Sequence, residues 1–148
     1  MSALFTIGHS NQSIESFVDL LRLHGVESVY DVRSKPYSRF LPQFRRENLE
    51  KELAGEKIGY VFMGDKLGGK PKPAPEQFEL GLSQLRADAP RMKIAVMCAE
   101  KHPMNCHRCW SIAENLPDLQ VMHIHGDGHL QSHVDLMREQ PPKQASLF

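Results

Sequence analysis

The stretch from Lys93 to Cys98, KIAVMC, decides the fold class, because its apolar run is unbroken after the first residue. Such short runs are typical of central strands in parallel sheets, which are buried on both faces. Cys98 stands at the carboxyl end of this run and is followed by a polar segment, AEKHPMNCHR, over residues 99–108. The sequence therefore predicts a buried strand that brings a polar site to the edge of a sheet.

Strand and helix patterns alternate on both sides of this stretch. Four more apolar segments are predicted strands: residues 3–7, 26–33, 58–63 and 120–124. Helical periodicity or helix-forming composition predicts helices between Ser13 and Gly25 and over residues 46–54, 76–87, 105–115 and 130–138. This alternation favours an α/β fold, with a mainly parallel five-stranded sheet and helices on both faces. We expect a single domain over residues 1–140 and a flexible C-terminal tail over residues 141–148.

Composition limits the classes of partner. The chain has 148 residues, and 18 basic side chains balance 18 acidic ones, so its net charge does not favour nucleic acid or anionic membranes. No run approaches the roughly 20 apolar residues of a membrane span, so we expect no membrane partner. Three cysteines are an odd number for a disulfide framework, so reduced thiols and a cytoplasmic location are expected.

A polar cluster follows each of the five predicted strands. The clusters are GHSN at 8–11, DVRSKP at 31–36, GDKLGGK at 64–70, the segment 98–108, and HIHGDG at 123–128. Ligand sites of open α/β sheets lie at the carboxyl ends of the strands. We therefore expect one pocket to collect these clusters, with the long loops 34–45 and 64–75 as binding elements.

The types of residue in these clusters indicate their candidate roles. Cys98 is a candidate nucleophile or ligand, because cationic neighbours lower the pKa of a thiol. The candidate acid–base groups are His9, Asp31 and Glu100. The candidate substrate-binding residues are Arg33, Arg108, Ser10, Gly68, Gly69 and His107. Arg108 lies ten residues after Cys98, whereas a phosphatase-type loop has its arginine six residues after the cysteine, so the sequence is not that of a cysteine phosphatase.

Each candidate also has a purely structural interpretation. The cysteines, Cys106 and Cys109 above all, are equally typical of small buried apolar residues. Arg108 can pair with Glu100 or Asp31, and Asp31 and Arg33 can simply satisfy the strand ends. The basic and aromatic residues of the 37–46 loop can contact nucleic acid, although such a run is usually a solvated loop.

Eight histidines raise the question of a metal. Cys106 and Cys109 form one Cys-x2-Cys pair without a second pair, so a closed zinc site is not predicted and no metal ligand is assigned. An open site that uses His9, Cys98 or His125 is an alternative. His129 and His133 are expected on an exposed helix face.

A set of short motifs in a fixed order resembles a known family. The motifs are TIGHS at 6–10, DVR at 31–33 with Pro36 and Ser38, LGG at 67–69, Cys98-x-Glu100 with Pro103, CHR at 106–108, and His123-Ile124. Over residues 6–128 the chain is similar to the bacterial family named domain of unknown function 488 (DUF488). The resemblance implies a compact α/β domain and supports the site, without specifying a reaction.

Three functions follow as hypotheses. The leading one is an enzyme, a hydrolase or transferase, that acts on an anionic, phosphate-bearing substrate such as a nucleotide or nucleic-acid end. The second is a non-catalytic module that binds a nucleotide or nucleic acid through the arginines and the 37–46 loop. The third is a metal-dependent hydrolase that uses His9, Cys98, His107 or His125. The sequence identifies neither a cofactor nor an oligomeric state.

Overall fold

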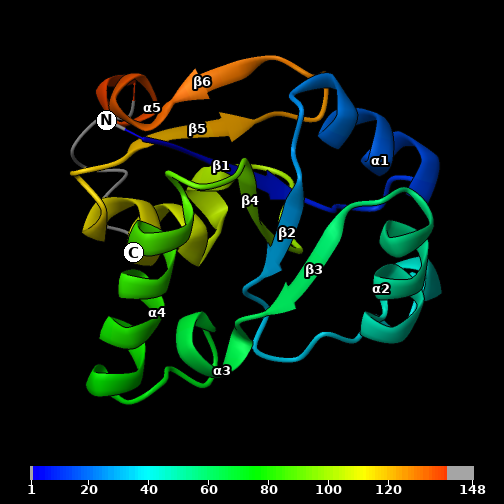
Figure 1. The fold of residues 1–148 in the computed structure, drawn as a ribbon, viewed down its shortest axis with the longest axis horizontal. Helices are drawn as coiled ribbons and strands as arrows, with labels where there is room; N and C mark the ends of the chain where they lie inside the picture. The colour runs from blue at the N-terminus through cyan, green and yellow to red at the C-terminus, as the bar shows by residue number, and fades with distance from the viewer. Residues whose placement is uncertain (1, 140–148) are drawn as a thin grey trace.

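The computed structural model describes residues 2–139, which form one twisted sheet with helices on both faces (Figure 1). The strand order is β3-β2-β4-β1-β5-β6. The strands are β1 (Ala3–Gly8), β2 (Ser28–Asp31), β3 (Gly59–Phe62), β4 (Ile94–Cys98), β5 (Gln120–Ile124) and β6 (Leu130–Ser132). The tail predicted at 141–148 lies outside the described residues.

The KIAVMC stretch forms β4, which is buried along its whole length and lies between β2 and β1. All pairings among β1 to β5 are parallel, as predicted. The expectation of five strands is incomplete, because β6 pairs antiparallel with β5 at the sheet edge. This strand occupies the first three residues of the segment predicted as the last helix, and α5 begins only at His133.

The α-helices cover both faces of the sheet. They are α1 (Ile14–Leu23), α2 (Arg46–Gly55), α3 (Gly64–Leu67), α4 (Pro75–Asp88) and α5 (His133–Glu139). The Ser13 side chain caps α1 by accepting a hydrogen bond from the backbone N–H of Ser16, as its position predicted. Figure 1 shows α1 and α2 at one side of the sheet and α3 and α4 at the other. Among residues 2–139, no helix has the length and apolarity needed to cross a membrane.

Two apolar cores result from the alternation of side chains along the strands. One core joins Phe5, Ile7 and Met97 to the inner faces of α1 and α2. The other joins Leu4, Val96 and Cys98 to α3, α4 and the segment after β4. Successive residues of β4 therefore contribute to opposite cores, and Cys98 belongs to the face that carries the segment 103–115.

That segment is not the regular helix predicted over 105–115. It consists of a 3-10 turn η2 (Pro103–Asn105), a π-helical turn η3 (Arg108–Ile112) and a second 3-10 turn η4 (Ala113–Asn115). Cys106 has an extended backbone between the first two turns. A π-helical turn shifts the direction of the side chains that follow it, and such turns are frequent at functional sites.

Candidate functional site

A cavity of about 580 Å³ opens at the carboxyl ends of β1, β2 and β4, and we call it the strand-end pocket. Its lining comes from the clusters that follow four strands. The residues are His9, Arg33, Ser34, Lys35, Tyr37, Ser38, Gly69, Lys70, Cys98, Ala99, Glu100, Asn105, Cys106 and His107. Six of the ten candidate site residues are in this set, so the parallel sheet does bring them together.

The expectation that one pocket collects all five clusters is wrong. Ser10 and the HGDG segment after β5 line a second cavity of about 550 Å³, together with Lys101 and His102. The cause lies in the peptide after β4, since backbone N–H groups of His9 and Ser10 donate to the carbonyls of Cys98 and Ala99. These two hydrogen bonds bind the ends of β1 and β4 together between the two cavities.

Asp31 and Arg33 form a buried bidentate ion pair below the strand-end pocket. Arg33 Nη2 donates to Asp31 Oδ2 at 2.8 Å, and Arg33 Nε donates to Oδ1 at 2.9 Å. The Tyr60 hydroxyl donates to Asp31 Oδ2 at 2.5 Å, and burial raises the pKa of Tyr60. Arg33 Nη1 donates to the Phe44 carbonyl at 2.7 Å. These partners occupy both carboxylate oxygens of a completely buried Asp31, so the geometry matches the structural interpretation of this pair.

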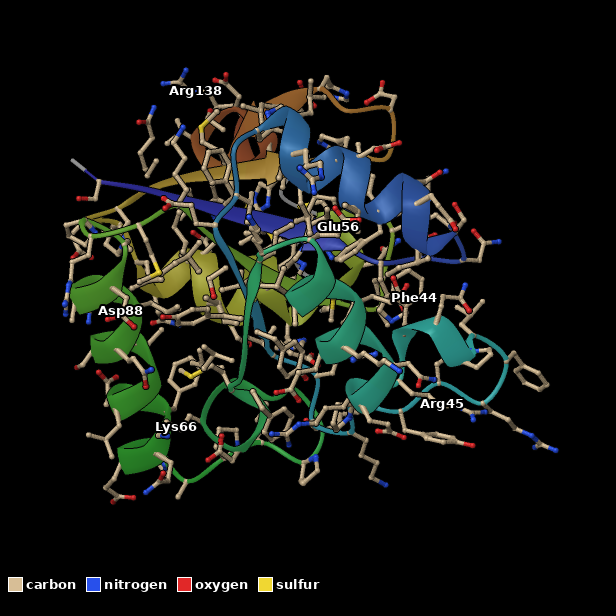
Figure 2. The ribbon with its side chains drawn as sticks, turned by 45° about the vertical axis from the view of Figure 1, so that its right-hand side comes forward. Phe44, Arg45, Glu56, Lys66, Asp88 and Arg138 are labelled. Carbon is tan, nitrogen blue, oxygen red and sulfur yellow. A yellow bond between two sulfur atoms is a disulfide. The ribbon has the colours of Figure 1, made fainter. Side chains whose placement is uncertain are left out.

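His9 lies against Phe44 on the wall of the pocket. The two rings stack at a centroid distance of 4.3 Å, and Phe44 comes from the turn before α2 (Figure 2). The Nδ1 atom donates to the Ser10 carbonyl at 2.7 Å, so Nε2 carries the lone pair and faces Arg33 Nη1 at 3.4 Å. Burial lowers the pKa of His9 to about 4, and the nearby Arg33 contributes to this shift. The imidazole is therefore neutral at pH 7 and can accept a proton only at Nε2.

Cys98 and Cys106 are joined by a disulfide at the floor of the pocket. The prediction of reduced thiols is therefore wrong for these two residues, and Cys109 is the free cysteine among residues 2–139. No spacing signal in the sequence identifies this pair, because the contact depends on the return of the chain through η2 toward the end of β4. Both residues are almost fully buried, and both still line the cavity.

Arg108 is completely buried beneath this disulfide, away from the cavity lining. Its Nη1 atom donates to Cys98 Sγ at 2.7 Å and to the Glu100 carbonyl at 2.8 Å, and Nη2 donates to the Lys101 carbonyl at 3.1 Å. The ion pairs of residues 2–139 do not include Arg108, and its Nε has no hydrogen-bond partner there. Burial lowers the pKa of Arg108 to about 10, so it stays protonated at pH 7. A buried cation therefore points at a sulfur atom.

His107 closes the pocket from the side of α3. Its ring is hydrogen-bonded through Nε2 to the Val32 carbonyl at 3.0 Å, and Nδ1 lies 3.6 Å from Cys106 Sγ. Burial lowers the pKa of His107. Gly69 lies against this ring, and a Cβ atom there would stand 3.1 Å from it. Gly68 is buried, and a Cβ atom there would overlap Ser34 Oγ, so both glycines serve close packing.

The 37–46 loop forms the outer rim of the pocket. Two of its cations stack on its own aromatic rings, with the Arg45 guanidinium 4.7 Å from the centroid of Tyr37 and that of Arg39 5.3 Å from Phe40. Tyr37 is 61% exposed and Phe40 81% exposed, so two aromatic faces remain available to solvent. Arg45 also donates to the Ser38 and Arg39 carbonyls, and these bonds fix the shape of the loop.

Sequence analysis placed two lining cations in polar clusters without assigning them as site residues, and it missed the disulfide. Lys35 and Lys70 are exposed residues of the strand-end pocket, and Glu100 is the carboxylate of its lining. The lysines fall inside the two loops predicted to be binding elements, and that position was the available signal. Ser34 supports the wall between them, because its Oγ accepts a hydrogen bond from the backbone N–H of Lys70 at 3.1 Å.

The residues of the open metal hypothesis do not come together. His9, Cys98 and His107 belong to the strand-end pocket, whereas His125 lines the second cavity and stacks on exposed His129. His133, expected on an exposed helix face, is instead 91% buried, because the first turn of α5 packs against β5. It lies beside Cys109 and His123, and these three residues are the metal-compatible group found within residues 2–139.

Comparisons with known proteins give one match. No curated protein and no solved structure gives a significant match to this chain. Residues 13–77 match the family model described as Domain of unknown function DUF488. The matched region runs from the cap of α1 to the start of α4 and includes the Asp31–Arg33 pair, Lys35 and Lys70. This match supports the assignment of the chain to the DUF488 family, which the motifs of the sequence had indicated.

Proposed function

We propose that this protein is a cysteine-dependent enzyme that acts on a phosphate-bearing substrate in the strand-end pocket. The observation that carries the proposal is the hydrogen bond from buried Arg108 to Cys98 Sγ. A buried guanidinium without a carboxylate partner is costly, and a thiolate at Cys98 is the anion that would neutralise it. The same contact stabilises the thiolate relative to the thiol, which is how nucleophilic cysteines are activated.

The proposed chemistry requires the reduced protein. With the disulfide opened, the Cys98 thiolate attacks the electrophilic phosphorus or acyl carbon of the substrate, and the bond to the leaving group breaks. The chain lacks the phosphatase-type loop, so the lysines of the lining, and not such a loop, would hold the phosphate group. His107, with its ring at the pocket wall, is the proposed proton carrier, since it stays neutral at pH 7 and can exchange one proton with water or the leaving group. Water then cleaves the covalent intermediate and regenerates the Cys98 thiolate.

The charge of the lining supports an anionic substrate. The lining contains three cationic side chains, those of Arg33, Lys35 and Lys70. Glu100 is the carboxylate of the same lining. Exposed Tyr37 in the lining offers a face on which a nucleobase can stack, and exposed Phe40 follows three residues later in the same loop. A nucleotide or the end of a nucleic acid fits both features. Arg33 and Arg108, expected to hold the anion directly, are assigned here to the buried scaffold because internal partners take up most of their donors.

The test uses reduced full-length protein with p-nitrophenyl phosphate, p-nitrophenyl acetate and a set of nucleoside phosphate esters. We expect turnover of at least one of them, and we expect Cys98→Ser to abolish it. The matched control is Cys106→Ser, which keeps the nucleophile and should keep turnover while removing inactivation by oxidants. Replacement of Lys35 and Lys70 by Gln should raise KM for phosphate esters and leave the acetate unaffected. Equal turnover in Cys98→Ser would overturn the proposal.

A second candidate function rests on the disulfide itself. Two cysteines that form a disulfide at a cavity can pass two electrons to a disulfide substrate. The protein changes from dithiol to disulfide as the substrate changes to two thiols. The same Cys106→Ser variant separates the two functions. It retains turnover if Cys98 is a nucleophile for phosphate-bearing substrates, and it loses turnover if both cysteines are needed for dithiol exchange.

A further inference from the structure

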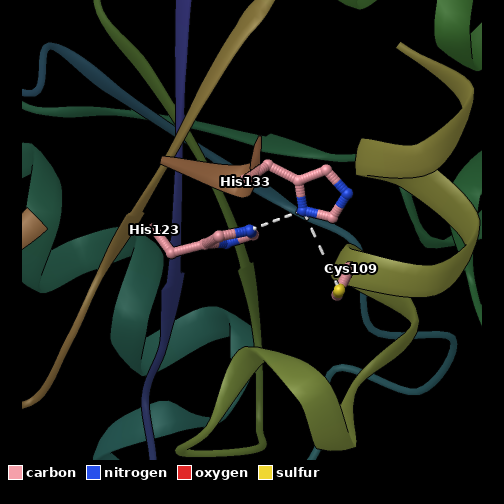
Figure 3. Close-up of side chains that lie close together, drawn as sticks. All are labelled: Cys109, His123 and His133. Carbon is pink, nitrogen blue, oxygen red and sulfur yellow. Dashed lines mark hydrogen bonds between the residues drawn. The ribbon is translucent and has the colours of Figure 1, made fainter. Parts of the chain in front are cut away.

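Cys109, His123 and His133 form a sealed polar cluster on the sheet face opposite α1 and α2, and we call it the buried cluster (Figure 3). Cys109 and His123 have no exposed surface, and His133 is 9% exposed. Three different elements supply these residues, namely η3, β5 and the first turn of α5. The strand-end pocket does not include any of them. The proposed function therefore leaves this group unexplained.

Three donor atoms converge inside the cluster. His123 Nε2 lies 3.0 Å from His133 Nδ1, and Cys109 Sγ lies 3.9 Å from the same Nδ1. All three atoms lie within 4.8 Å of one another. Bond lengths of about 2.1 Å to nitrogen and 2.3 Å to sulfur require ligand separations of roughly 3.3 to 3.8 Å around one metal ion. The distances from His133 Nδ1 to the other two donors differ from these separations by a few tenths of an ångström, and the Cys109–His123 pair would have to close to the same range.

The outer nitrogens of both imidazoles already have oxygen partners. His133 Nε2 donates to Glu114 Oε2 at 3.1 Å, so the lone pair of a neutral His133 is on the inner Nδ1 atom. His123 Nδ1 lies 2.6 Å from Thr6 Oγ1, its register partner on β1. When the Thr6 hydroxyl accepts this hydrogen bond, the lone pair of His123 also points inward. Oxygen partners on the outer nitrogen are the usual second shell of metal-binding histidines.

A fourth soft donor lies next to the thiol. Cys109 Sγ is 3.7 Å from Met104 Sδ, and Met104 is held in place because the indole of Trp110 donates to its backbone carbonyl. One thiolate, two imidazoles and one thioether form a donor set for soft late transition metals.

We propose that the buried cluster is a metal site for Zn²⁺ or Cu⁺, bound by Cys109 Sγ, His123 Nε2 and His133 Nδ1. Zn²⁺ would use these three ligands, and Cu⁺ would also use Met104 Sδ. The ion would join η3 to the β5 edge of the sheet and to α5. His133 also lines a cavity of about 540 Å³ beside this site, and the bound ion would hold the 103–115 segment against the sheet.

The experiment exploits the cysteine count of the chain. Three cysteines are present in total, so in the Cys98→Ser/Cys106→Ser double variant Cys109 is the sole thiol. Reduced, chelator-treated full-length double variant is titrated anaerobically with Zn²⁺, with Cu⁺ and with Co²⁺ as a spectroscopic probe for zinc. We expect one equivalent to bind against a competing chelator, a rise in Tm, and a thiolate-to-cobalt charge-transfer band, which only Cys109 can supply.

Three further variants locate the site and identify the metal. His133→Gln should lower the affinity by at least a hundredfold, whereas the matched control His129→Gln, at the exposed stacked histidine, should leave it unchanged. Met104→Leu should weaken Cu⁺ and spare Zn²⁺ if copper is the ion. Absence of stoichiometric binding of both ions to the folded double variant would overturn the proposal, and absence of the cobalt–thiolate band would overturn it for Zn²⁺. In that case the four side chains Thr6, His123, His133 and Glu114 form a hydrogen-bonded chain only.

Discussion

The strand-end pocket and the buried cluster both contain cysteine, yet their surroundings are opposite. Cys98 lines an open cavity and receives a hydrogen bond from a buried guanidinium. Cys109, one residue beyond that arginine, is sealed among Met104, His133 and apolar side chains, and burial raises its pKa to about 12. The first environment favours a charged sulfur and the second favours a neutral one unless a metal ion is bound.

This difference shows that neighbours in sequence need not share a site. Arg108 and Cys109 are consecutive residues of the η3 turn, but Arg108 points to the end of β4 and Cys109 points to β5 and α5. The backbone of a π-helical turn, wider than an α-helix, delivers its side chains to two sides of the segment. The chemistry of Cys98 and of Cys109 therefore depends on the direction in which the side chains of this turn point, and not on their distance along the sequence.

The largest expected effect is a contrast in thiol reactivity. In the reduced protein at pH 8, Cys109 should react with iodoacetamide more than about a thousandfold slower than a free thiol, given its raised pKa, and Cys98 should react faster than a free thiol. Arg108→Met should slow Cys98 by at least about tenfold, and it should not speed up Cys109, because the charge of Arg108 lowers the pKa of that thiol as well. Mass spectrometry of each alkylated peptide gives both rates, with unfolded protein as the reference. Equal alkylation rates at Cys98 and Cys109 in the native protein would contradict the contrast between their two environments.

The second largest effect concerns the close contact between the ends of β1 and β4, which separates the strand-end pocket from the second cavity. A Cβ atom at Gly8 would overlap the Glu100 carbonyl, which also accepts a hydrogen bond from Arg108. Gly8→Ala should therefore lower the free energy of unfolding by about 3 kcal/mol. Gly55→Ala is the control, because open space surrounds that position at the end of α2, and it should be neutral or slightly stabilising. Urea denaturation measures both, and equal stabilities would contradict the close approach.

The smallest effect is the pH dependence contributed by His9. Its folded-state pKa of about 4 lies below the unfolded value of 6.5, so the unfolded chain binds a proton first as the pH falls. The stability due to neutral His9 is complete above pH 6.5 and is lost as the pH falls from about 6.5 to about 4. Between pH 7 and 5.5 the loss should be about 1.2 kcal/mol. In urea denaturation at pH 7 and pH 5.5, the His9→Gln variant should lose correspondingly less free energy of unfolding than the unsubstituted protein. An equal loss in both proteins would show that His9 titrates normally.

The sequence predicted the sheet well because its strands are continuous apolar runs. The KIAVMC stretch has the period and length of a central strand, and it lies at the centre of the sheet. Strand β6 was missed because its three residues, Leu130–Ser132, have no pattern of their own and become a strand by pairing with β5. Local propensity also could not separate a regular helix over 105–115 from three irregular turns, since the choice depends on the contact of Arg108 with Cys98.

The candidate site was predicted by position more successfully than by role. Parallel strands bring their carboxyl ends to one edge, so His9, Cys98 and Glu100 meet in one cavity. The partner of each side chain depends on tertiary contacts: Arg33 pairs with Asp31 two residues away, and Cys98 bonds to Cys106 across a loop. His133 illustrates the same limit, because a helix pattern cannot show that its first turn packs onto a buried histidine of a strand.

The η3 turn makes the two sites thermodynamically interdependent. Opening the Cys98–Cys106 disulfide would change the contact of Arg108 with Cys98 Sγ, and an ion would change the contacts of Cys109. Each event therefore acts on the same five-residue backbone segment. If the ion shifts the reduction equilibrium of the disulfide by some factor, reduction must shift the affinity for the ion by the same factor. Redox poise and metal supply would then act on this chain as reciprocal effectors, although the two ligands never touch.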